Sequence, residues 1–281
     1  MKKRSEELLE SQDIEIRLVV EAIFEKYGYD FRNYSQAHIK RRILNRFNIS
    51  GLKSISEMIH EVLYNPKFVD LILMDLSINV TEMFRDPSFY KALREEVIPL
   101  IQKQPFIKIW HAGCSSGEEV YSMAILLKEE GIYQKTQIYA TDFNPVIIRQ
   151  AKEGQYPLNR MKEFTMNYQK AGGKGSFSDY YSIHHDRAKL LDSLKKNIVF
   201  ATHNLVTDSV FAEVKLIVCR NVLIYFNRQL QDKVIHLFID TLPGGGILCL
   251  GSKENLQFSE HVAQFDPLIE KERIYIKKYT V

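Results

Sequence analysis

The 281-residue chain has little of what a disulfide-bonded, zinc-binding or membrane-spanning protein needs. Its three cysteines, Cys114, Cys219 and Cys249, form no CxxC pair and no Cys/His ligand spacing, which argues against a disulfide framework and a zinc site. Each lies in an apolar stretch, which favours buried thiols in a reducing compartment. No apolar run approaches the roughly 18 residues that cross a bilayer, and no signal-peptide core follows residues 1–4. We therefore expect a soluble cytoplasmic protein without a bound metal.

The composition is that of a globular protein, with 45% hydrophobic and 26% charged residues over a length typical of about two domains. A net charge of +3 is too small to argue for nucleic-acid binding. That average hides a basic block, because residues 26–53 hold seven Lys or Arg residues against Asp30 alone, a local charge of +6. The block favours an acidic partner, although by itself it is better explained as a solvated helix face.

Apolar residues recur at three- and four-residue steps through residues 1–76, which predicts an all-helical domain. The stripe Ile16–Phe24 indicates a helix that stops at Gly28. A capping box begins at Ser54, and Asn65-Pro66 separates the third helix from a fourth. The second helix carries the cations of the basic block beside its apolar side; they are Lys40, Arg41, Arg42 and Arg46.

Residues 77–105 are predicted to form a linker and a connecting helix. Asp86-Pro87 begins this helix, with Asp86 as N-cap and Pro87 at the first position. Its apolar stripe follows at four-residue steps through Phe89, Leu93, Val97 and Ile101.

From residue 106 the pattern changes to alternating strands and helices. The predicted strands are 106–112, 137–143, 198–202, 214–219 and 246–250, and the predicted helices are 118–130, 145–154 and 228–242. This alternation predicts a mostly parallel sheet covered on both faces, in a domain of residues 106–281. Residues 155–196 interrupt it as an insertion, in which Gly172–Gly175 suggests a hairpin turn and Phe177–Ile183 a strand.

The turn after the first of these strands indicates a cationic ligand. Gly113 and Gly117 allow a tight turn and close backbone approach, as in dinucleotide sites. The following helix begins with Glu118-Glu119, whose negative charge would repel a pyrophosphate but suits the ammonium and sulfonium of S-adenosylmethionine (SAM). Asp142, at the end of the next strand, lies where an acidic residue takes ribose hydroxyls. Helix-dipole complementation is the ordinary alternative for the two glutamates.

Five segments resemble the CheR-type chemotaxis methyltransferases. They are residues 79–86 (NVTEMFRD), 117–122 (GEEVYS), 140–143 (ATDF), 203–205 (HNL) and 219–226 (CRNVLIYF). Enzymes of this family use SAM to form methyl esters on glutamate side chains of chemoreceptors and release S-adenosylhomocysteine. The resemblance implies a Rossmann-like α/β SAM-dependent methyltransferase domain with a small antiparallel β insertion, preceded by an all-α domain.

The resemblance also implies site residues. Those expected to bind the cofactor are Asn79, Thr81, Arg85, Gly113, Glu118, Asp142, Asn204, Leu205, Asn221 and Val222. Arg85 and Tyr225 are the candidate catalytic residues, because a guanidinium and a phenol can orient a substrate carboxylate. Arg41, Arg42 and Arg46 would bind the methylation helices of a receptor. Without the resemblance, most of these side chains would be interpreted as turn, cap or surface-pair residues.

The expected function is that of a monomeric, cytoplasmic protein-glutamate O-methyltransferase in chemotaxis adaptation, a form of signal transduction. Its partner would be the cytoplasmic domain of a chemoreceptor, with the β insertion as a place where a receptor C-terminal tail could add a strand. Two alternatives stay open: a methyltransferase of the same fold that acts on another protein or a small molecule, and a SAM-sensing scaffold without catalysis.

Overall fold

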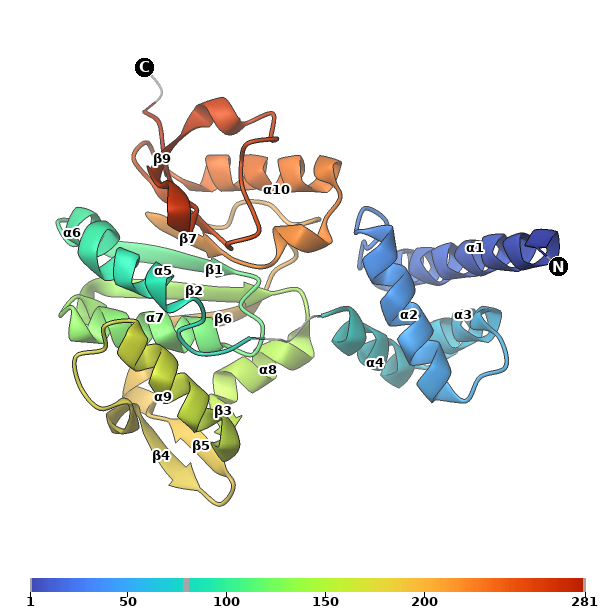
Figure 1. The fold of residues 1–281 in the computed structure, drawn as a ribbon, viewed down its shortest axis with the longest axis horizontal. Coiled ribbons are helices and arrows are strands. Elements are labelled where there is room, and N and C mark those ends of the chain that lie inside the picture. Colours follow the sequence, from blue (N-terminus) through green and yellow to red (C-terminus); the bar gives the residue numbers. More distant parts are fainter. Residues whose placement is uncertain (1, 78–80, 280–281) are drawn as a thin grey trace. The chain divides into compact units, whose positions relative to one another are not determined.

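In the computed structural model, residues 2–77 and 81–279 are described. The chain divides into two compact units (Figure 1). Unit 1 holds residues 1–78 and 225–231, and unit 2 holds residues 79–224 and 232–281. The sequence pattern does not indicate that residues 225–231 group with unit 1.

The described part of unit 1 contains four helices in succession: α1 (Lys2–Tyr27), α2 (Gln36–Ser50), α3 (Ile55–Tyr64) and α4 (Pro66–Leu76). The predicted all-α character is confirmed, and the helix ends agree with their local signals. Gly28, directly after α1, has a φ of +76° that favours glycine. The Ser54 side chain caps α3 by accepting a hydrogen bond from Glu57 N at 3.3 Å. Asn65 caps α4 in the same way, through Phe68 N.

Apolar side chains from all four helices fill the interior of unit 1. Those with no exposed surface are Val19, Ile23, Ile43, Met58, Val62 and Ile72. Residues 225–231 join this unit through backbone hydrogen bonds, from Ser35 N to Tyr225 O at 2.8 Å and from Asn227 N to Asn33 O at 2.9 Å. Tyr225 is thereby held within the helical unit.

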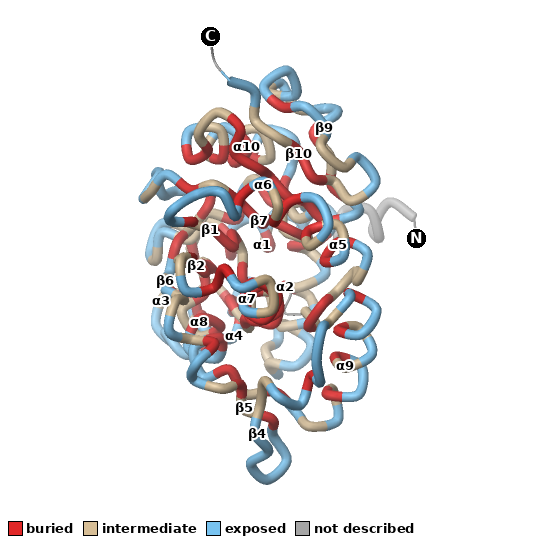
Figure 2. Tube along the Cα trace, turned by 90° about the vertical axis from the view of Figure 1, so that its left-hand side faces the viewer, coloured by how far each residue is buried: buried red, intermediate tan, exposed pale blue. Residues whose placement is uncertain are grey.

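Within the described residues, unit 2 is built on a seven-stranded sheet of order β6-β2-β1-β7-β8-β10-β9. Its strands are β1 (Ile107–Ala112), β2 (Thr136–Asp142), β6 (Ile198–Thr202), β7 (Leu216–Cys219), β8 (Ile247–Leu250), β9 (Phe265–Ile269) and β10 (Ile274–Lys277). Neighbouring strands from β6 to β8 pair in parallel, as predicted. The central strands β7 and β8 are buried at every residue, as expected for strands covered on both faces (Figure 2).

The order in which the chain adds strands to the sheet reverses between β1 and β7, although these two strands are parallel. From β1 the chain continues to β2 and β6 on one side, whereas from β7 it continues to β8 on the other. In open α/β sheets, ligands bind beyond the carboxyl ends of the strands at such a switch point. The loops after β1 and β7 are therefore where a ligand is expected.

The hairpin of β9 and β10 is absent from the sequence prediction. Both strands run antiparallel to their neighbours at the edge of the sheet. β9 includes Asp266 and Pro267, both exposed, so it lacks the apolar run that marks the inner strands. Proline is tolerated on an edge strand because an edge leaves backbone N–H groups unpaired.

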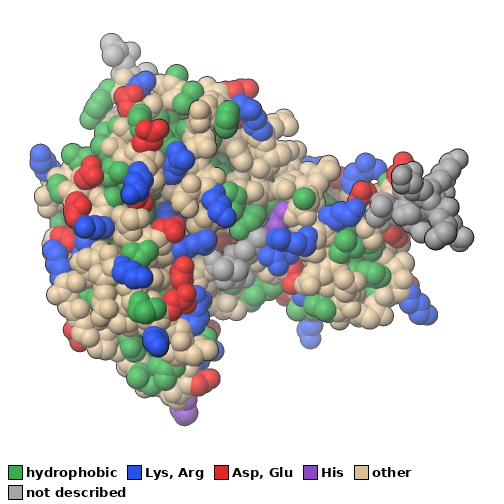
Figure 3. All heavy atoms as spheres, viewed as in Figure 1, with side chains coloured by type: hydrophobic (Ala, Val, Ile, Leu, Met, Phe, Trp, Pro, Cys, Tyr) green, Lys and Arg blue, Asp and Glu red, His purple; other side chains and the backbone are tan. Residues whose placement is uncertain are grey.

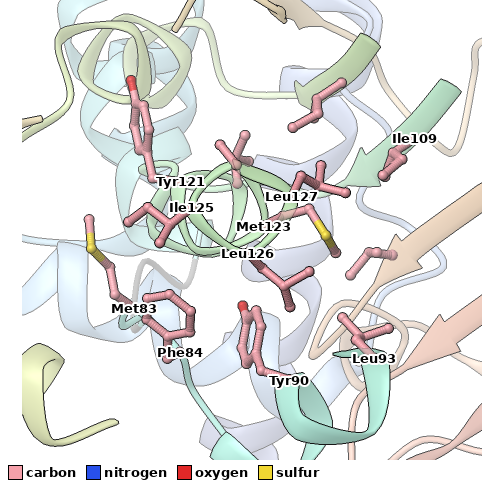
Figure 4. Packing of buried hydrophobic residues seen from close by; sticks show 14 of the residues in the cluster. Met83, Phe84, Tyr90, Leu93, Ile109, Tyr121, Met123, Ile125, Leu126 and Leu127 are labelled. Atoms are coloured by element: carbon pink, nitrogen blue, oxygen red, sulfur yellow. The ribbon is translucent and has the colours of Figure 1, made fainter. Parts of the chain in front are cut away.

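Helices cover both faces of the sheet: α7 (Glu118–Glu129), α8 (Pro145–Glu153) and α10 (Arg228–Thr241). On one face, Ile109 and its neighbours form the buried apolar cluster with α7. Figure 4 shows Phe84 and Tyr90 beside Leu126 of α7 in this cluster. On the opposite face, the Trp110 ring lies 5.6 Å from the Phe238 ring of α10.

The connecting helix is less regular than predicted. It consists of α5 (Pro87–Ala92), a π-helical turn η1 (Leu93–Val97) and α6 (Ile98–Ile101). The predicted stripe of Phe89, Leu93, Val97 and Ile101 is nevertheless buried throughout. Because a π-helical turn keeps the chain helical, the interruption is not visible in the apolar spacing.

The insertion contains the implied small antiparallel sheet, with β3 (Gln155–Pro157), β4 (Tyr181–His184) and β5 (Arg187–Leu190) in the order β3-β5-β4. Two details of the sequence prediction are wrong. Gly172–Gly175 follows a helix, α9 (Met161–Lys170), and is not a hairpin turn. The strand begins only at Tyr181, because residues 177–180 form a 3-10 turn that buries Phe177. At Gly173 a Cβ would lie 2.2 Å from the Tyr168 ring, so the loop is shaped by that ring.

The remaining short 3-10 turns are η2 (Tyr133–Lys135), η3 (Leu158–Arg160), η5 (Asp192–Leu194), η6 (Leu223–Tyr225), η7 (Val262–Gln264) and η8 (Glu270–Glu272). The three cysteines are buried and unpaired, as predicted. Of the helices in residues 2–77 and 81–279, none combines the length and apolar character that a bilayer crossing requires.

Candidate cofactor and substrate site

The loops that follow the parallel strands of unit 2 meet at one edge of the sheet. Gly113 N and Cys114 N, just after β1, both donate to Thr141 O of β2 at 2.8 Å. His203 N, just after β6, donates to Asp142 O at 3.1 Å. The predicted cofactor residues of these loops are thereby brought together.

Gly113 lies where the loops after β1 and β7 touch. It has a φ of +80°, and a Cβ at this position would lie 2.5 Å from Val222 Cγ2. The residue must be glycine for both reasons. Gly117, with a φ of +92°, is the N-cap residue of α7, and a Cβ there would lie 3.1 Å from Ala151 Cβ. The two predicted glycines therefore shape a close turn at the switch point.

Asp142 supports the same turn through its side chain. Its carboxylate accepts hydrogen bonds from Ser115 N at 3.0 Å and Asn144 N at 3.1 Å. The first bond holds Ser115 in a left-handed conformation, with a φ of +50°, that a non-glycine residue seldom adopts. Burial raises the pKa of Asp142 from 3.8 to about 6.

Glu118 is a buried carboxylate with few partners. It is 3% exposed, and burial raises its pKa from 4.5 to about 7. Ser116 Oγ donates to its Oε2 at 2.7 Å, and Arg160 Nη1 lies 3.8 Å from its Oε1. Both contacts lower the pKa but do not offset the burial. A cation that bound here would compensate for the lost hydration.

The neighbouring Glu119 has a different environment. Its carboxylate contacts Arg220 Nη1 at 2.9 Å and His111 Nδ1 at 3.3 Å. Although burial raises its pKa, the bond to His111 and the Arg220 charge leave it lowered. Arg220 is itself buried, with its guanidinium 4.0 Å from the Phe89 ring and 2.5 Å from Asp86 Oδ2. Glu119 therefore belongs to a buried ion network and does more than complement the helix dipole.

That network also fixes the segment of Arg85. The residues on either side, Phe84 and Asp86, have φ of +52° and +54° although neither is glycine. Phe84 N donates to Ser122 Oγ at 2.9 Å, and Arg220 Nη1 donates to Arg85 O at 3.4 Å. Asp86 is the N-cap residue of α5 and Pro87 its first residue, as predicted, but the Asp86 carboxylate pairs with Arg220 and makes no cap hydrogen bond.

Glu254 organises the loop that contains Asn221 and Val222. Its buried carboxylate accepts hydrogen bonds from Asn221 N, Val222 N, Ile224 N and Gly251 N, at 2.6 to 3.2 Å. Asn221 has a φ of +61°, so this loop too needs external support. Gly251 allows the approach, since a Cβ there would lie 2.8 Å from Asn221 N.

Asn204 and Leu205 follow β6 directly after His203. Asn204 Oδ1 accepts from Val206 N at 3.0 Å, and Asn204 N donates to Asp208 Oδ2 at 2.9 Å. Leu205 is buried. These bonds form an Asx turn that holds the loop beside Asp142.

The predicted receptor-binding arginines lie on α2 in unit 1, and the cations of this helix differ in their partners. Figure 3 shows Lys and Arg side chains of the molecule in blue. Arg46 Nε donates to Asp75 Oδ2 at 2.5 Å, with both side chains mostly buried. Lys40 pairs with Asp13 at 2.6 Å. Arg41 is exposed, and Arg42 Nε is buried without a hydrogen-bond partner in the described residues. Arg41 and Arg42 are thus the arginines of α2 that pair with no carboxylate in the described residues.

Tyr225 belongs to unit 1 and Arg85 to unit 2. The Tyr225 ring lies 4.9 Å from that of His38, which is buried on α2. Asn79 lies outside the described residues. The roles of all these residues stay predictions, whereas the shared sheet edge of Gly113, Glu118, Asp142, Asn204 and Val222 is a feature of the fold.

Sequence reasoning missed three charged residues of this edge: Arg160, Arg220 and Glu254. Arg220 lies inside the motif at residues 219–226, so its place before Asn221 could have indicated a site residue. Glu254 lies shortly after the end of β8, which is a weaker indication of a site residue. Arg160 lies in the insertion, and nothing in its sequence neighbourhood indicates that it reaches Glu118.

Two family models match consecutive parts of the chain. Residues 14–77 match the CheR methyltransferase all-alpha domain, and residues 79–271 match the CheR methyltransferase SAM binding domain. The chain belongs to the CheR methyltransferase family. The predicted resemblance, the methyltransferase activity class and the SAM cofactor are thereby confirmed.

Relatives of this CheR family member align over most of their length. The Cher3 protein of Pseudomonas putida is 51% identical over 94% of this chain and 97% of its own. A chemotaxis protein methyltransferase of Listeria innocua is 32% identical over 82% and 85%, respectively. One from Borreliella burgdorferi is 27% identical over 92% and 93%.

The residues at the CheR sheet edge fit the SAM cofactor. The desolvated Glu118 carboxylate suits an ammonium group, and the absence of a side chain at Gly113 keeps the loops after β1 and β7 in close contact beside it. Asp142 is a second acceptor at the neighbouring strand end, where ribose hydroxyls are bound in related sheets. Both carboxylates disfavour a phosphate-bearing ligand.

Proposed function

We propose that this chain transfers the methyl group of SAM to glutamate side chains of chemoreceptors, as a cytoplasmic monomer that serves chemotaxis adaptation. The observation that carries the proposal is that both CheR domains occur in one chain that aligns along its length with chemotaxis protein methyltransferases. When bound, SAM supplies a methyl group activated by its sulfonium.

The acceptor needs no general base. A glutamate side chain has an ordinary pKa of about 4.3, so it is ionised near neutral pH. The reaction joins an anion to a cationic donor, and positioning and exclusion of water then lower the barrier. Arg85 and Tyr225 would orient the acceptor carboxylate through a guanidinium and a phenol. The contacts that hold the backbone around Arg85 support this role, because an orienting side chain must not move.

Two arginines of α2 would recognise the acidic methylation helices of a receptor. Arg41 and Arg42 carry this role in the proposal, since Arg46 is engaged by Asp75 within unit 1. Charges of this kind raise the association rate and depend on salt.

A receptor tail would add to the insertion as a further strand. β4 is an edge strand of the small sheet in the described residues, and its Ile183 is 60% exposed. Extended peptides bind such edges through backbone hydrogen bonds.

Transfer of labelled methyl groups from SAM to a purified receptor cytoplasmic fragment tests the function. We expect alkali-labile label that is released as methanol, and its loss when the receptor glutamates are changed to alanine. Alkali-stable label would indicate another acceptor chemistry. Cofactor binding without label on any acceptor would favour a sensing scaffold.

Variants of the two candidate catalytic residues test how the acceptor is held. Arg85→Ala and Tyr225→Phe should lower methyl transfer more than they lower the affinity for S-adenosylhomocysteine. Unchanged turnover in both variants would remove them from the mechanism.

A charge reversal on α2 tests the receptor surface. Arg41→Glu with Arg42→Glu should weaken receptor methylation most at low salt. Arg17→Glu with Lys67→Glu is the matched control, because both side chains are exposed elsewhere in unit 1. Equal effects of the two pairs would contradict a specific role of α2.

A further inference from the structure

Arg160 connects the insertion to two parts of the cofactor edge. It ends the 3-10 turn η3 (Leu158–Arg160), just before α9. Its Nη1 donates to Thr81 O at 2.9 Å and lies 3.8 Å from Glu118 Oε1. Thr81 and Glu118 are both predicted cofactor residues, so one guanidinium lies beside both.

The guanidinium of Arg160 is held in place but is not saturated by its acidic neighbours. Its Cζ lies 4.7 Å from the centre of the Phe164 ring, which fixes its plane. The Glu118 and Glu163 carboxylates lie at 3.8 and 3.7 Å, beyond hydrogen-bond distance. Because one third of its side chain is exposed, Arg160 can donate hydrogen bonds to a further anionic partner.

The amino-acid end of SAM carries two opposite charges on one carbon atom. Its ammonium suits Glu118. The carboxylate carbon lies only two bonds from the ammonium nitrogen, so it would lie close to Glu118 as well. Such a zwitterion needs a cation beside the acidic residue, and a guanidinium binds a carboxylate with two parallel hydrogen bonds.

We propose that Arg160 binds the carboxylate of the methionine moiety of the cofactor while Glu118 binds its ammonium. The insertion then contributes directly to the cofactor site. This inference rests on the cofactor binding that the proposed function requires, and not on the identity of the methyl acceptor.

Calorimetry with two ligands tests the contact. S-adenosylhomocysteine carries the carboxylate, and its decarboxylated analogue, 5′-deoxy-5′-(3-aminopropylthio)adenosine, keeps the ammonium but lacks the carboxylate. Arg160→Gln should weaken S-adenosylhomocysteine binding by about 10- to 100-fold, as expected for a lost charge-assisted hydrogen bond. It should leave the decarboxylated analogue within about threefold.

Three further variants sharpen the test. Arg160→Lys keeps the charge but not the paired donors, so it should lose part of the preference for the carboxylate. Arg149→Gln removes an exposed arginine of α8 and should change neither affinity. Arg85→Ala tests the other arginine that the sequence predicts to bind the cofactor, and the ligand preference of this variant should persist.

Three results would overturn the proposal. Equal weakening of both ligands by Arg160→Gln would show a structural role through Thr81, and loss of ligand preference only in Arg85→Ala would move the contact to Arg85. Failure of the wild-type protein to bind S-adenosylhomocysteine would refute the cofactor site itself. Binding without receptor methylation would refute the proposed acceptor and leave the Arg160 contact in place.

Discussion

The two ends of α7 each carry a pair of glutamates, Glu118-Glu119 and Glu129-Glu130, in opposite electrostatic situations. A helix N-terminus favours negative charge and a C-terminus disfavours it. The helix dipole alone would thus stabilise the ionised form of the first pair and destabilise that of the second pair. The side chains around them reverse this expectation.

At the C-terminal end, both carboxylates are neutralised. Arg94 contacts Glu129 and also Glu130, the latter at 2.7 Å, and both Arg94 and Glu129 are buried. Glu129 also accepts from the hydroxyls of Tyr168 and Tyr180. Although burial raises the pKa of Glu130, the bonds from Lys174 and Arg94 leave it lowered.

At the N-terminal end, only Glu119 is neutralised, by Arg220 and His111. Glu118 has Ser116 within hydrogen-bond distance and Arg160 farther away, and its pKa is raised to about 7. Groups that face it also include Tyr156 and Cys114, both neutral near pH 7 with raised pKa values. Glu118 therefore costs stability in the free protein, as is common for binding residues.

Removal of the buried cation at the C-terminal end should have the largest effect. Arg94→Met removes the buried cation beside Glu129 and leaves Glu130 with Lys174 as its ion-pair partner, and we expect the free energy of unfolding to fall by about 3–5 kcal/mol. Urea denaturation measures this value. Lys91→Met is the control, because its pair with Glu95 is exposed. A loss under about 1 kcal/mol for Arg94→Met would mean that its ion pairs with Glu129 and Glu130 add little to stability.

Stability should depend on pH through Glu118. The folded-state pKa of about 7 exceeds the ordinary 4.5, so between these values the folded state holds a proton that the unfolded state has lost. The free energy of unfolding therefore falls as the pH rises through this window, by about 3 kcal/mol in total. Glu118→Gln should remove this term, so its advantage over the wild type should grow from pH 5 to pH 8. A constant difference would contradict the raised pKa.

The two ends of α7 should also differ in their effect on cofactor affinity. Glu118→Gln should weaken S-adenosylhomocysteine binding by about 2 kcal/mol, as for a hydrogen bond to a charged group. Glu130→Gln, at the other end of the same helix, should change it little. Calorimetry at pH 8 measures both, and similar losses would mean that the effect passes through the stability of α7.

The smallest effect should come from the exposed cation at the C-terminal end. Lys174 pairs with Glu130 at 2.8 Å, but its side chain is 54% exposed. Lys174→Met should cost under about 1 kcal/mol of unfolding free energy. A cost equal to that of Arg94→Met would show that burial does not determine how much each ion pair contributes to the free energy of unfolding.

Much of the fold could be predicted from local patterns. The strand and helix alternation after residue 106, the glycine turn at Gly113 and the strand-end Asp142 were all recognisable. These features depend on residues close in the sequence, through apolar period, turn chemistry and strand length. The C-terminal hairpin was not predicted, because an edge strand such as β9 needs no continuous apolar run.

The electrostatic roles in the site could not be predicted in the same way. Arg46 faces Asp75, Arg220 faces both Asp86 and Glu119, and Glu254 faces the loop of Asn221. The partners of these charges lie 29 to 134 positions away along the chain. The sequence shows which residues are charged, but it does not show which distant backbone groups or side chains they contact.

The family, the fold class, the cofactor and the parallel part of the sheet followed from the sequence, because apolar periodicity and short motifs act locally. Which of the two adjacent glutamates is neutralised, and which is left for a ligand, depends on tertiary contacts. The tertiary structure also brought Arg160 to Glu118 from an insertion without a recognisable motif. The physical reason is that burial and pairing arise between distant segments and set the charge state of each carboxylate.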